Sequence, residues 1–420
     1  MKWKFYYDES FHDRSITVKD DNINIYKDNA ADVFVGFFTG YMESDEEIIW
    51  NQYKIFDENY RKEFTIEDGK ELKGKTIKRK NYRNGFASFF PKTIDFYNDF
   101  FDILNNDKVV FHIGMFSKTE VVVREFIRNL QFPEYINFHE DSFIYSVVKF
   151  LYNYRNKEFL IKMMEIKSTD NAQNVLFELK KMMFDVISNI GDAKRKQAEK
   201  QGLNEVLCLL NYAKIKEFIP PELSWRYEPI FIGFNKLLKE RKIKQEEVDL
   251  FIDEEKNTFE AAINIGNYRK CECVKSEVNI GIRISDILSH FFGEISAGLE
   301  SELREPEIIN EHDIIGYDYK SKKLLSEKWF EISERQYLLW RKIGMLFSDY
   351  QRYEWTGYDG VFCDYPVLAF GLLEYICHYD TYEAYKKIPS AMHREYFNTY
   401  CCVKLSELYK RGGSKPAIYN

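Results

Sequence analysis

Apolar and aromatic residues in the first 118 positions recur at the spacing of strands, with amphipathic segments between them. Residues 3–10, WKFYYDES, predict a short aromatic strand that runs into acids, and residues 16–26 predict one or two further strands. A strand is also predicted for the apolar run ADVFVGFFTGYM at 31–42, where glycines indicate bends. The other elements expected here are helices at 44–61 and 89–106 and a buried strand at 107–117.

The middle of the chain has a different pattern. Between residues 118 and 244 the apolar positions follow i, i+3, i+4 and i+7, which predicts helices almost throughout. VDLFIDEE at 248–255 is the last clear strand pattern, and an amphipathic helix is expected at 281–296. Beyond Gly298 the chain has a helical and aromatic pattern to its end.

The strand patterns therefore fall in two separated parts of the chain. This favours an α/β fold whose core is built from residues 1–118 and 245–298. Residues 119–244 would form an all-helical insertion, and residues 299–420 an all-helical C-terminal extension.

The composition limits the classes of function. The 420 residues are 45% hydrophobic and 17% aromatic, enough for two or three packed units and too apolar for a disordered chain. The formal net charge is −8, so any nucleic-acid site must be a local basic patch. No apolar run reaches the roughly 18 residues that span a bilayer, and the start MKWKFYYDES lacks the apolar region of a signal peptide. Seven scattered cysteines fit a reducing compartment, so a cytoplasmic location without membrane contact is expected.

Residues 69–76, GKELKGKT, match the phosphate-binding pattern G-x-x-x-x-G-K-[ST]. Such a loop needs a buried strand before it and a long helix after it. Here the preceding RKEFTIEDG is mostly charged, and Asn84-Gly85 signals a turn soon afterwards. A P-loop NTPase using Gly69–Thr76, with VDLFIDEE as its acidic strand, is kept as an alternative.

Acidic residues follow two of the predicted strands. Asp8 and Glu9 come after KFYY, Asp253 and Glu254 come after LFI, and Asp286 lies near the start of a predicted helix. One acid after a strand is usually a solvated turn residue. Several acids that converge would repel one another unless a divalent cation lay between them, and Mg²⁺ or Mn²⁺ prefers such oxygen ligands. Two such ions can assist the hydrolysis of a phosphodiester.

Four motifs together resemble a bacterial family, the domain of unknown function numbered "thirty-eight hundred". They are Y-x-D-E-S at 6–10, E-L-K at 71–73, the strand ending at Asp253, and S-x(5)-I-x-I-S-D-I-L from Ser276 to Leu288. The resemblance covers roughly residues 1–118 and 245–297 and implies an RNase H-like mixed sheet core. It implies a site of four catalytic, metal-binding acids around two Mg²⁺ or Mn²⁺ ions: Asp8, Glu71, Asp253 and Asp286.

The same resemblance gives GKELKGKT a second interpretation. Its functional part would be Glu71-Leu72-Lys73, with Lys73 contacting a phosphate and the flanking glycines incidental. Further residues expected to support the site are Glu9, Ser10, Glu254, Ser276 and His290. For His290, four residues after Asp286 on the helix, a role in packing is the simpler alternative.

Three residues depart from the family pattern. Phe11 stands where the family usually has Gly, Arg283 where Gln is common, and Ser285 where Ala is common.

A basic run at 73–83 lies beside the E-L-K motif. It could bind a phosphate backbone, although a solvated loop would have the same composition. The residues expected to contact nucleic acid are Lys75, Lys78, Arg79, Lys80 and Arg83.

The sequence thus predicts a divalent-metal-dependent nuclease or phosphodiesterase on an RNase H-like core. From the family resemblance, it would act in mobile-element or phage defence. The helical parts would select the substrate, RNA or DNA, or mediate homo-oligomer assembly. The alternative from another class is a non-catalytic RNase H-like scaffold that binds nucleic acid or protein, since a fold does not fix a function.

Overall fold

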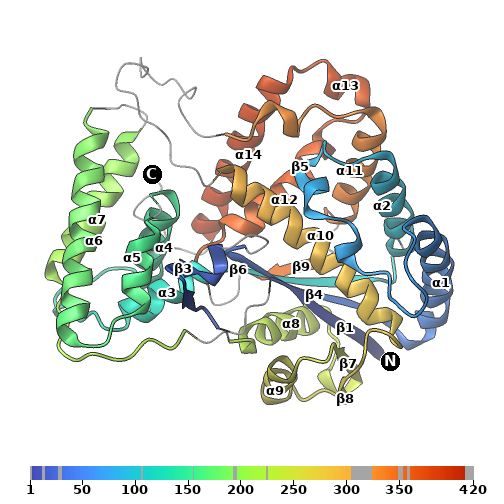
Figure 1. The fold of residues 1–420 in the computed structure, drawn as a ribbon, viewed down its shortest axis with the longest axis horizontal. Coiled ribbons are helices and arrows are strands. Elements are labelled where there is room, and N and C mark those ends of the chain that lie inside the picture. The colour runs from blue at the N-terminus through green and yellow to red at the C-terminus, as the bar shows by residue number, and fades with distance from the viewer. Residues whose placement is uncertain are drawn as a thin grey trace.

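A mixed sheet of six strands organises the chain, in the order β8-β7-β1-β4-β6-β9 (Figure 1). In this computed structural model β1, β4 and β6 are antiparallel neighbours, whereas β7 is parallel to β1, β8 to β7 and β9 to β6. The strands are β1 (Trp3–Ser10), β4 (Val33–Met42), β6 (Val110–Ser117), β7 (Val248–Ile252), β8 (Lys270–Cys273) and β9 (Tyr353–Thr356). The structure describes residues 2–11, 15–26, 31–105, 107–154, 156–192, 196–223, 226–303, 324–348, 353–356 and 360–411.

Smaller elements and helices complete the fold. A short hairpin joins β2 (Val18–Lys19) and β3 (Asn22–Ile23), and β5 spans Arg83–Phe86. The helices are α1 (Glu46–Glu63), α2 (Pro91–Leu104), α3 (Lys118–Ile127), α4 (Glu140–Asn153), α5 (Lys157–Met164), α6 (Thr169–Ile190), α7 (Gln197–Tyr212), α8 (Glu228–Glu240), α9 (Lys256–Ile265), α10 (Ile280–Leu303), α11 (Glu334–Leu346), α12 (Asp364–Tyr375), α13 (Tyr382–Lys386) and α14 (Ser390–Arg411).

The central strands are apolar on both sides because both faces of the sheet are covered. In β4 nine of ten residues are buried, a pattern typical of strands packed between two layers. On one face α10 crosses β1 and β4, with the rings of Phe292 and Phe37 5.5 Å apart. On the other face α8 lies against the sheet, where Phe234 stacks on Phe38 at 4.2 Å. The two faces have separate apolar cores.

The helical prediction for residues 119–244 is confirmed for the part of that range that the structure describes. Only one isolated bridge, between Gln131 and Lys214, interrupts the helices α3 to α8 there. Helices α4 to α7 form a group to one side of the sheet (Figure 1). The last helix of the range, α8, instead covers the sheet itself, so it packs as part of the core.

The prediction of an all-helical C-terminal extension is wrong. Strand β9 lies in that extension and pairs with β6 at the edge of the sheet. Strand β8 also follows VDLFIDEE, which the sequence pattern gave as the last clear strand. Both strands have only four residues, too few for a period of two to stand out.

None of the described helices is both long enough and apolar enough to cross a bilayer.

Candidate active site

Asp8 and Asp253 lie side by side because β1 and β7 are parallel. Tyr7 is in register with Ile252, so the residues that follow them are Asp8 and Asp253. The backbone N–H of Asp253 donates to the Tyr7 carbonyl at 3.4 Å, which continues the pairing to this point. Because β1 and β7 run in the same direction, their carboxyl ends lie at the same end of the sheet, and both acids lie there.

The face of the sheet is set by alternation along each strand. Tyr6 packs in the core under α10, so Asp8, two residues later, lies on that face as well. On β7 the ring of Phe251 stacks on Tyr6 at 5.2 Å, which puts Asp253 on the same side by the same rule. Asp8 is 9% exposed and Asp253 is partly buried.

Asp286 approaches the same end of the sheet from α10, which packs closely over β1. The Ser285 hydroxyl donates to the Tyr6 carbonyl at 2.9 Å. A Cβ on Gly281 would lie 2.2 Å from the Tyr6 ring, so only a glycine permits this approach. Asp286 accepts a hydrogen bond of 2.6 Å from the backbone N–H of Gly74, which ties the E-L-K segment to the helix.

The E-L-K segment contributes the fourth acid. Leu72 is fully buried and anchors the segment, while the Glu71 side chain is 8% exposed. One Glu71 oxygen, Oε2, accepts from the Ser276 hydroxyl at 3.1 Å and pairs with Lys73 Nζ at 3.0 Å. Ser276 itself is buried just before α10.

The carboxyl groups raise one another's pKa. Burial raises the pKa of Asp8 well above its ordinary value, and the charges of Asp286 and Asp253 raise it further. Burial also raises the pKa of Asp253, although Lys73 opposes the rise. For Asp286 burial again raises the pKa, against the hydrogen bond from Gly74. These acids lie close enough to repel one another, so an added cation would be stabilised here.

Buried polar atoms without a hydrogen-bond partner lie beside this cluster, among them Glu71 Oε1 and the Tyr53 hydroxyl. Burial raises the pKa of Tyr53; Arg283 opposes the rise, and the charges of Asp57, Asp286 and Glu71 add to it. Carboxylate oxygens are the ligands that Mg²⁺ and Mn²⁺ prefer, so the donor set fits such an ion chemically. Even so, the described residues contain no group of three or more side chains arranged to hold a metal. Glu71 is turned toward Lys73, and Asp286 toward Gly74.

The sequence pattern did not predict Tyr53 as a residue of the site, for a physical reason. It lies in α1 at the spacing of core residues, with Ile49, Phe56 and Tyr60 also buried. Nothing in that pattern indicates a hydroxyl that faces acids. The neighbouring Arg283 pairs with Asp57 at 3.4 Å and lies over the Tyr53 ring at 5.6 Å, which fixes this wall of the site.

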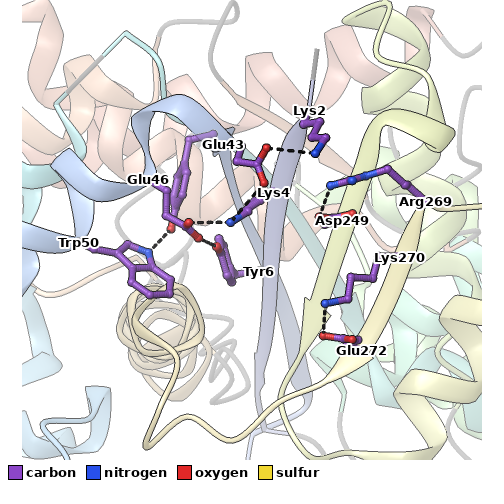
Figure 2. Close-up of polar contacts among 11 residues, drawn as sticks. Lys2, Lys4, Tyr6, Glu43, Glu46, Trp50, Asp249, Arg269, Lys270 and Glu272 are labelled. Carbon is purple, nitrogen blue, oxygen red and sulfur yellow. Dashed lines mark hydrogen bonds and ion pairs between the residues drawn. The ribbon is translucent and has the colours of Figure 1, made fainter.

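The start of the Y-x-D-E-S strand is held by polar contacts (Figure 2). The Tyr6 hydroxyl donates to Glu46 Oε1, and Lys4 Nζ donates to Glu46 Oε2 at 2.6 Å. Tyr6 therefore positions β1 against α1 and α10. Farther along the sheet, Asp249 of β7 pairs with Arg269, and Lys270 pairs with Glu272 at 2.7 Å (Figure 2).

Glu9 and Glu254 are not brought to the cluster. Glu9 points to the opposite face of the sheet, where the Tyr7 hydroxyl donates to it at 2.7 Å. Glu254 is exposed. Ser10 does lie on the α10 face, and its hydroxyl is 3.3 Å from that of Ser289.

His290 contacts the loop that follows the E-L-K motif. Its Nε2 is 3.1 Å from the Ile77 carbonyl, and its ring packs against Tyr82. A Cβ on Gly74 would lie 2.4 Å from His290 Cβ and 2.9 Å from the Asp286 carbonyl. The interpretation of both flanking glycines as incidental is therefore wrong for Gly74. Gly69 fits that interpretation better in terms of space, because nothing lies within 4 Å of an added Cβ.

The basic run divides into two groups. Four of its residues are exposed and free to meet solvent ions: Lys75, Lys78, Lys80 and Arg83. Arg79 instead pairs with the buried carboxylate of Glu294 at 2.9 Å, and its guanidinium lies 5.1 Å from the Phe11 ring. This internal ion pair sets Arg79 apart from the other cations of the run, and its expected contact with nucleic acid stays a prediction.

The GKELKGKT segment does not have the geometry of a P-loop. No strand precedes it, since α1 ends at Glu63 and irregular backbone follows. Two short 3₁₀ helices, Gly74–Thr76 at the end of the segment and Arg79–Tyr82 after it, stand in place of a long helix. The arrangement of strand, loop and helix that a P-loop requires is therefore not present at this segment.

Phe11 has a left-handed backbone, with φ of 60°. Glycine adopts this conformation without strain, whereas a residue with a Cβ rarely does. Here the aromatic ring fills space beside α10, where a Cβ on Gly293 would lie 2.9 Å from it.

No protein-family model, curated protein or solved structure matches this chain. The family resemblance therefore stays a prediction from the four motifs.

Proposed function

We propose that the protein is a divalent-metal-dependent phosphodiesterase of the nuclease type. The observation that carries this proposal is that acids from four separate segments meet at the carboxyl ends of β1 and β7, on one face of the sheet. Asp8 comes from β1, Asp253 follows β7, Asp286 is on α10 and Glu71 is on the E-L-K loop. Stability alone does not favour collecting like charges in this way.

The topology supports an RNase H-like core as part of the proposal. In chain order the first three long strands are antiparallel neighbours; β7 then adds in parallel beside β1, and β8 adds in parallel beside β7. A helix with an acid then follows and crosses the central strand. This is the arrangement expected of such a core, with β9 as an addition at the edge.

Within this proposal Asp8, Asp253 and Asp286 would hold the metal, and Glu71 would join them. The bound ion would lower the pKa of a coordinated water and offset charge on the phosphodiester. Ser276 orients Glu71 through its hydroxyl, while Gly74 orients Asp286 through its backbone N–H. Tyr53 and Leu72 exclude water from the inner side of the site, because both are fully buried.

The exposed cations of the basic run would hold the phosphate backbone next to the acids. They follow the E-L-K motif directly, so the segment that supplies Glu71 also supplies positive charge. Binding that depends on them should weaken as salt is added. Homo-oligomer assembly through the helical regions, a cytoplasmic location and a role in defence belong to the same proposal.

A cleavage assay tests it directly. Labelled RNA, DNA and hybrid duplex are incubated with Mg²⁺ or Mn²⁺ and with wild type, Asp253→Asn, or Glu260→Gln as the matched control. Glu260 is an exposed acid on α9, so its loss removes the same charge away from the cluster. Metal-dependent cutting by wild type and Glu260→Gln, lost in Asp253→Asn, would support the proposal. Cutting that survives in Asp253→Asn would contradict it.

The second candidate function is a scaffold that binds nucleic acid without cutting it. It is favoured by the absence, among the described residues, of a formed three-ligand metal group. A scaffold should show no metal-dependent rise in melting temperature, since an ion that binds the folded state stabilises it. It should still bind labelled nucleic acid in a salt-dependent way.

A further inference from the structure

The ammonium group of Lys73 lies within the carboxylate cluster. Its Nζ is 3.0 Å from Glu71 Oε2 and 3.3 Å from the Ser276 hydroxyl. The Lys73 side chain is 34% exposed, but its end pairs with the Glu71 carboxylate, which is 8% exposed. Burial lowers the pKa of Lys73, but the pairing with Glu71 and the charges of Asp286 and Asp253 outweigh it, and the pKa is raised overall.

The other cations of the segment do not serve this purpose. Lys75, Lys78 and Lys80 are exposed, and Arg79 is paired with Glu294. Among these cations, Lys73 therefore makes the close ion pair with the cluster, through Glu71. Its charge offsets part of the repulsion among the acids, as an opposite charge within a few ångströms does.

Lys73 and a metal ion would compete for the same carboxylate, that of Glu71. Glu71 Oε2 is engaged by Lys73, while Glu71 Oε1 is buried without a partner. A carboxylate that joins a divalent ion gives up much of its attraction for an ammonium group, and two cations so close repel each other. Lys73 must then release Glu71 when an ion is bound.

We propose that Lys73 is the built-in countercharge of the cluster, which must release Glu71 before a divalent ion can bind and thereby lowers the metal affinity of the site. This inference rests on the proposed function, because it assumes that the acids are metal ligands. It differs from the sequence-based expectation that Lys73 contacts a phosphate.

Calorimetric titration of the metal-free full chain with Mn²⁺ alone tests this. The variants are Lys73→Met and Lys73→Gln, with Lys70→Met as the matched control. Lys70 lies in the same loop, and its ion pair with Glu67 is exposed on both sides. Both Lys73 variants are expected to bind Mn²⁺ roughly tenfold more tightly than wild type, about 1.4 kcal/mol. Lys70→Met should bind it like wild type.

Melting in EDTA gives a second readout that does not depend on activity. Without Lys73 the acids repel one another more strongly, so both variants should have a lower melting temperature than wild type. Added Mn²⁺ should then raise their melting temperature by more than it raises that of wild type. Lys73→Arg keeps the charge and should behave more like wild type in both measurements.

The outcomes separate the two proposals. If wild type binds Mn²⁺ and the Lys73 variants bind it equally or more weakly, the countercharge role is overturned and the metal site stands. If only the Lys73 variants bind Mn²⁺, the countercharge role is supported in its strongest form. If no form of the protein binds Mn²⁺, the metal site fails, and the competition fails with it.

Discussion

Asp8 and Glu9 are consecutive residues of β1, but they face opposite sides of the sheet. Asp8 meets Asp253 and Asp286 under α10, whereas Glu9 meets the Tyr7 hydroxyl under α8. Burial raises the pKa of both carboxyl groups. The next influences differ: the charges of Asp286 and Asp253 raise the pKa of Asp8 further, whereas the hydrogen bond from Tyr7 lowers that of Glu9 and the charge of Glu255 raises it.

The comparison shows that burial of an acid does not by itself identify a site. A single buried carboxyl can be kept neutral and hydrogen-bonded, as an ordinary polar group of the core. Several carboxyls held together must keep protons or pair with a cation, either from the protein or from solution. The α10 face contains that second situation, with Lys73 as the internal cation.

The largest contrast is expected between Asp8→Asn and Glu9→Gln in metal-dependent cleavage. Asp8→Asn should lower the rate roughly a thousandfold, because it removes a charged ligand of the site. Glu9→Gln should stay within about fivefold of wild type, since an amide still accepts the Tyr7 hydrogen bond. Rates are measured on the substrate that wild type cuts best. Equal losses in both variants would remove the distinction between the faces.

The next effect concerns stability and pH on the α8 face. The pKa of Glu9 is raised from 4.5 to about 8, first by burial. The folded state therefore holds the proton more tightly, and this stabilisation is complete below pH 4.5 and is lost as pH rises through 8. As the pH rises over this window, the free energy of unfolding of Glu9→Gln should increase relative to that of wild type by as much as about 5 kcal/mol, at about 1.4 kcal/mol per pKa unit.

Urea unfolding in EDTA at pH 5, 7 and 8.5 measures that gain. A difference between Glu9→Gln and wild type that is constant with pH would show that Glu9 does not titrate in this range.

A third test compares two glycines of GKELKGKT. Gly74→Ala places a Cβ against His290 and the Asp286 carbonyl, so the loop must shift. We expect a loss of about 2 kcal/mol of stability from overpacking, and roughly tenfold lower activity from displacement of Glu71. Gly69→Ala meets no atoms but has φ of +81°, so it should cost about 1 kcal/mol without affecting activity. Circular dichroism melting and the cleavage assay distinguish them.

The smallest effect is expected at Phe11. Phe11→Gly relieves the left-handed strain but loses the ring beside Arg79, so stability should change by less than about 1 kcal/mol. Phe11→Ala keeps the strain and loses the ring, and it should be about 1 kcal/mol less stable than Phe11→Gly. Chemical denaturation of both variants measures the difference. A more stable Phe11→Ala would show that the backbone is not strained.

The strands and helices that frame the site followed from local pattern. Residues 3–10 and 248–252 have aromatic and β-branched runs, and α10 has an apolar stripe, so their elements were predicted. The acids at their ends were found because a strand fixes where its next residue points. The proximity of these acids is a tertiary feature, because it depends on the register of β1 with β7.

Other features depend on contacts that no local pattern contains. Arg79 looked like an exposed cation, but Glu294 lies far along the chain and pairs with it. Gly74 looked incidental because its close neighbour, His290, comes from α10. Strand β9 is four residues long and forms only because β6 offers an edge. In each case the partner is distant in sequence, so the residue's role could not be inferred from its neighbours.

The position of α8 in the chain has a consequence for synthesis. The rings of Phe5 and Tyr7 are covered by Phe234 and Phe231, and β1 pairs with β7. These partners leave the ribosome on the order of tens of seconds after β1, at ordinary translation rates. During that time the nascent chain presents an aromatic surface and an open strand edge. We expect nascent chains stalled before residue 228 to bind a ribosome-associated chaperone, and chains stalled well beyond residue 273 to have released it.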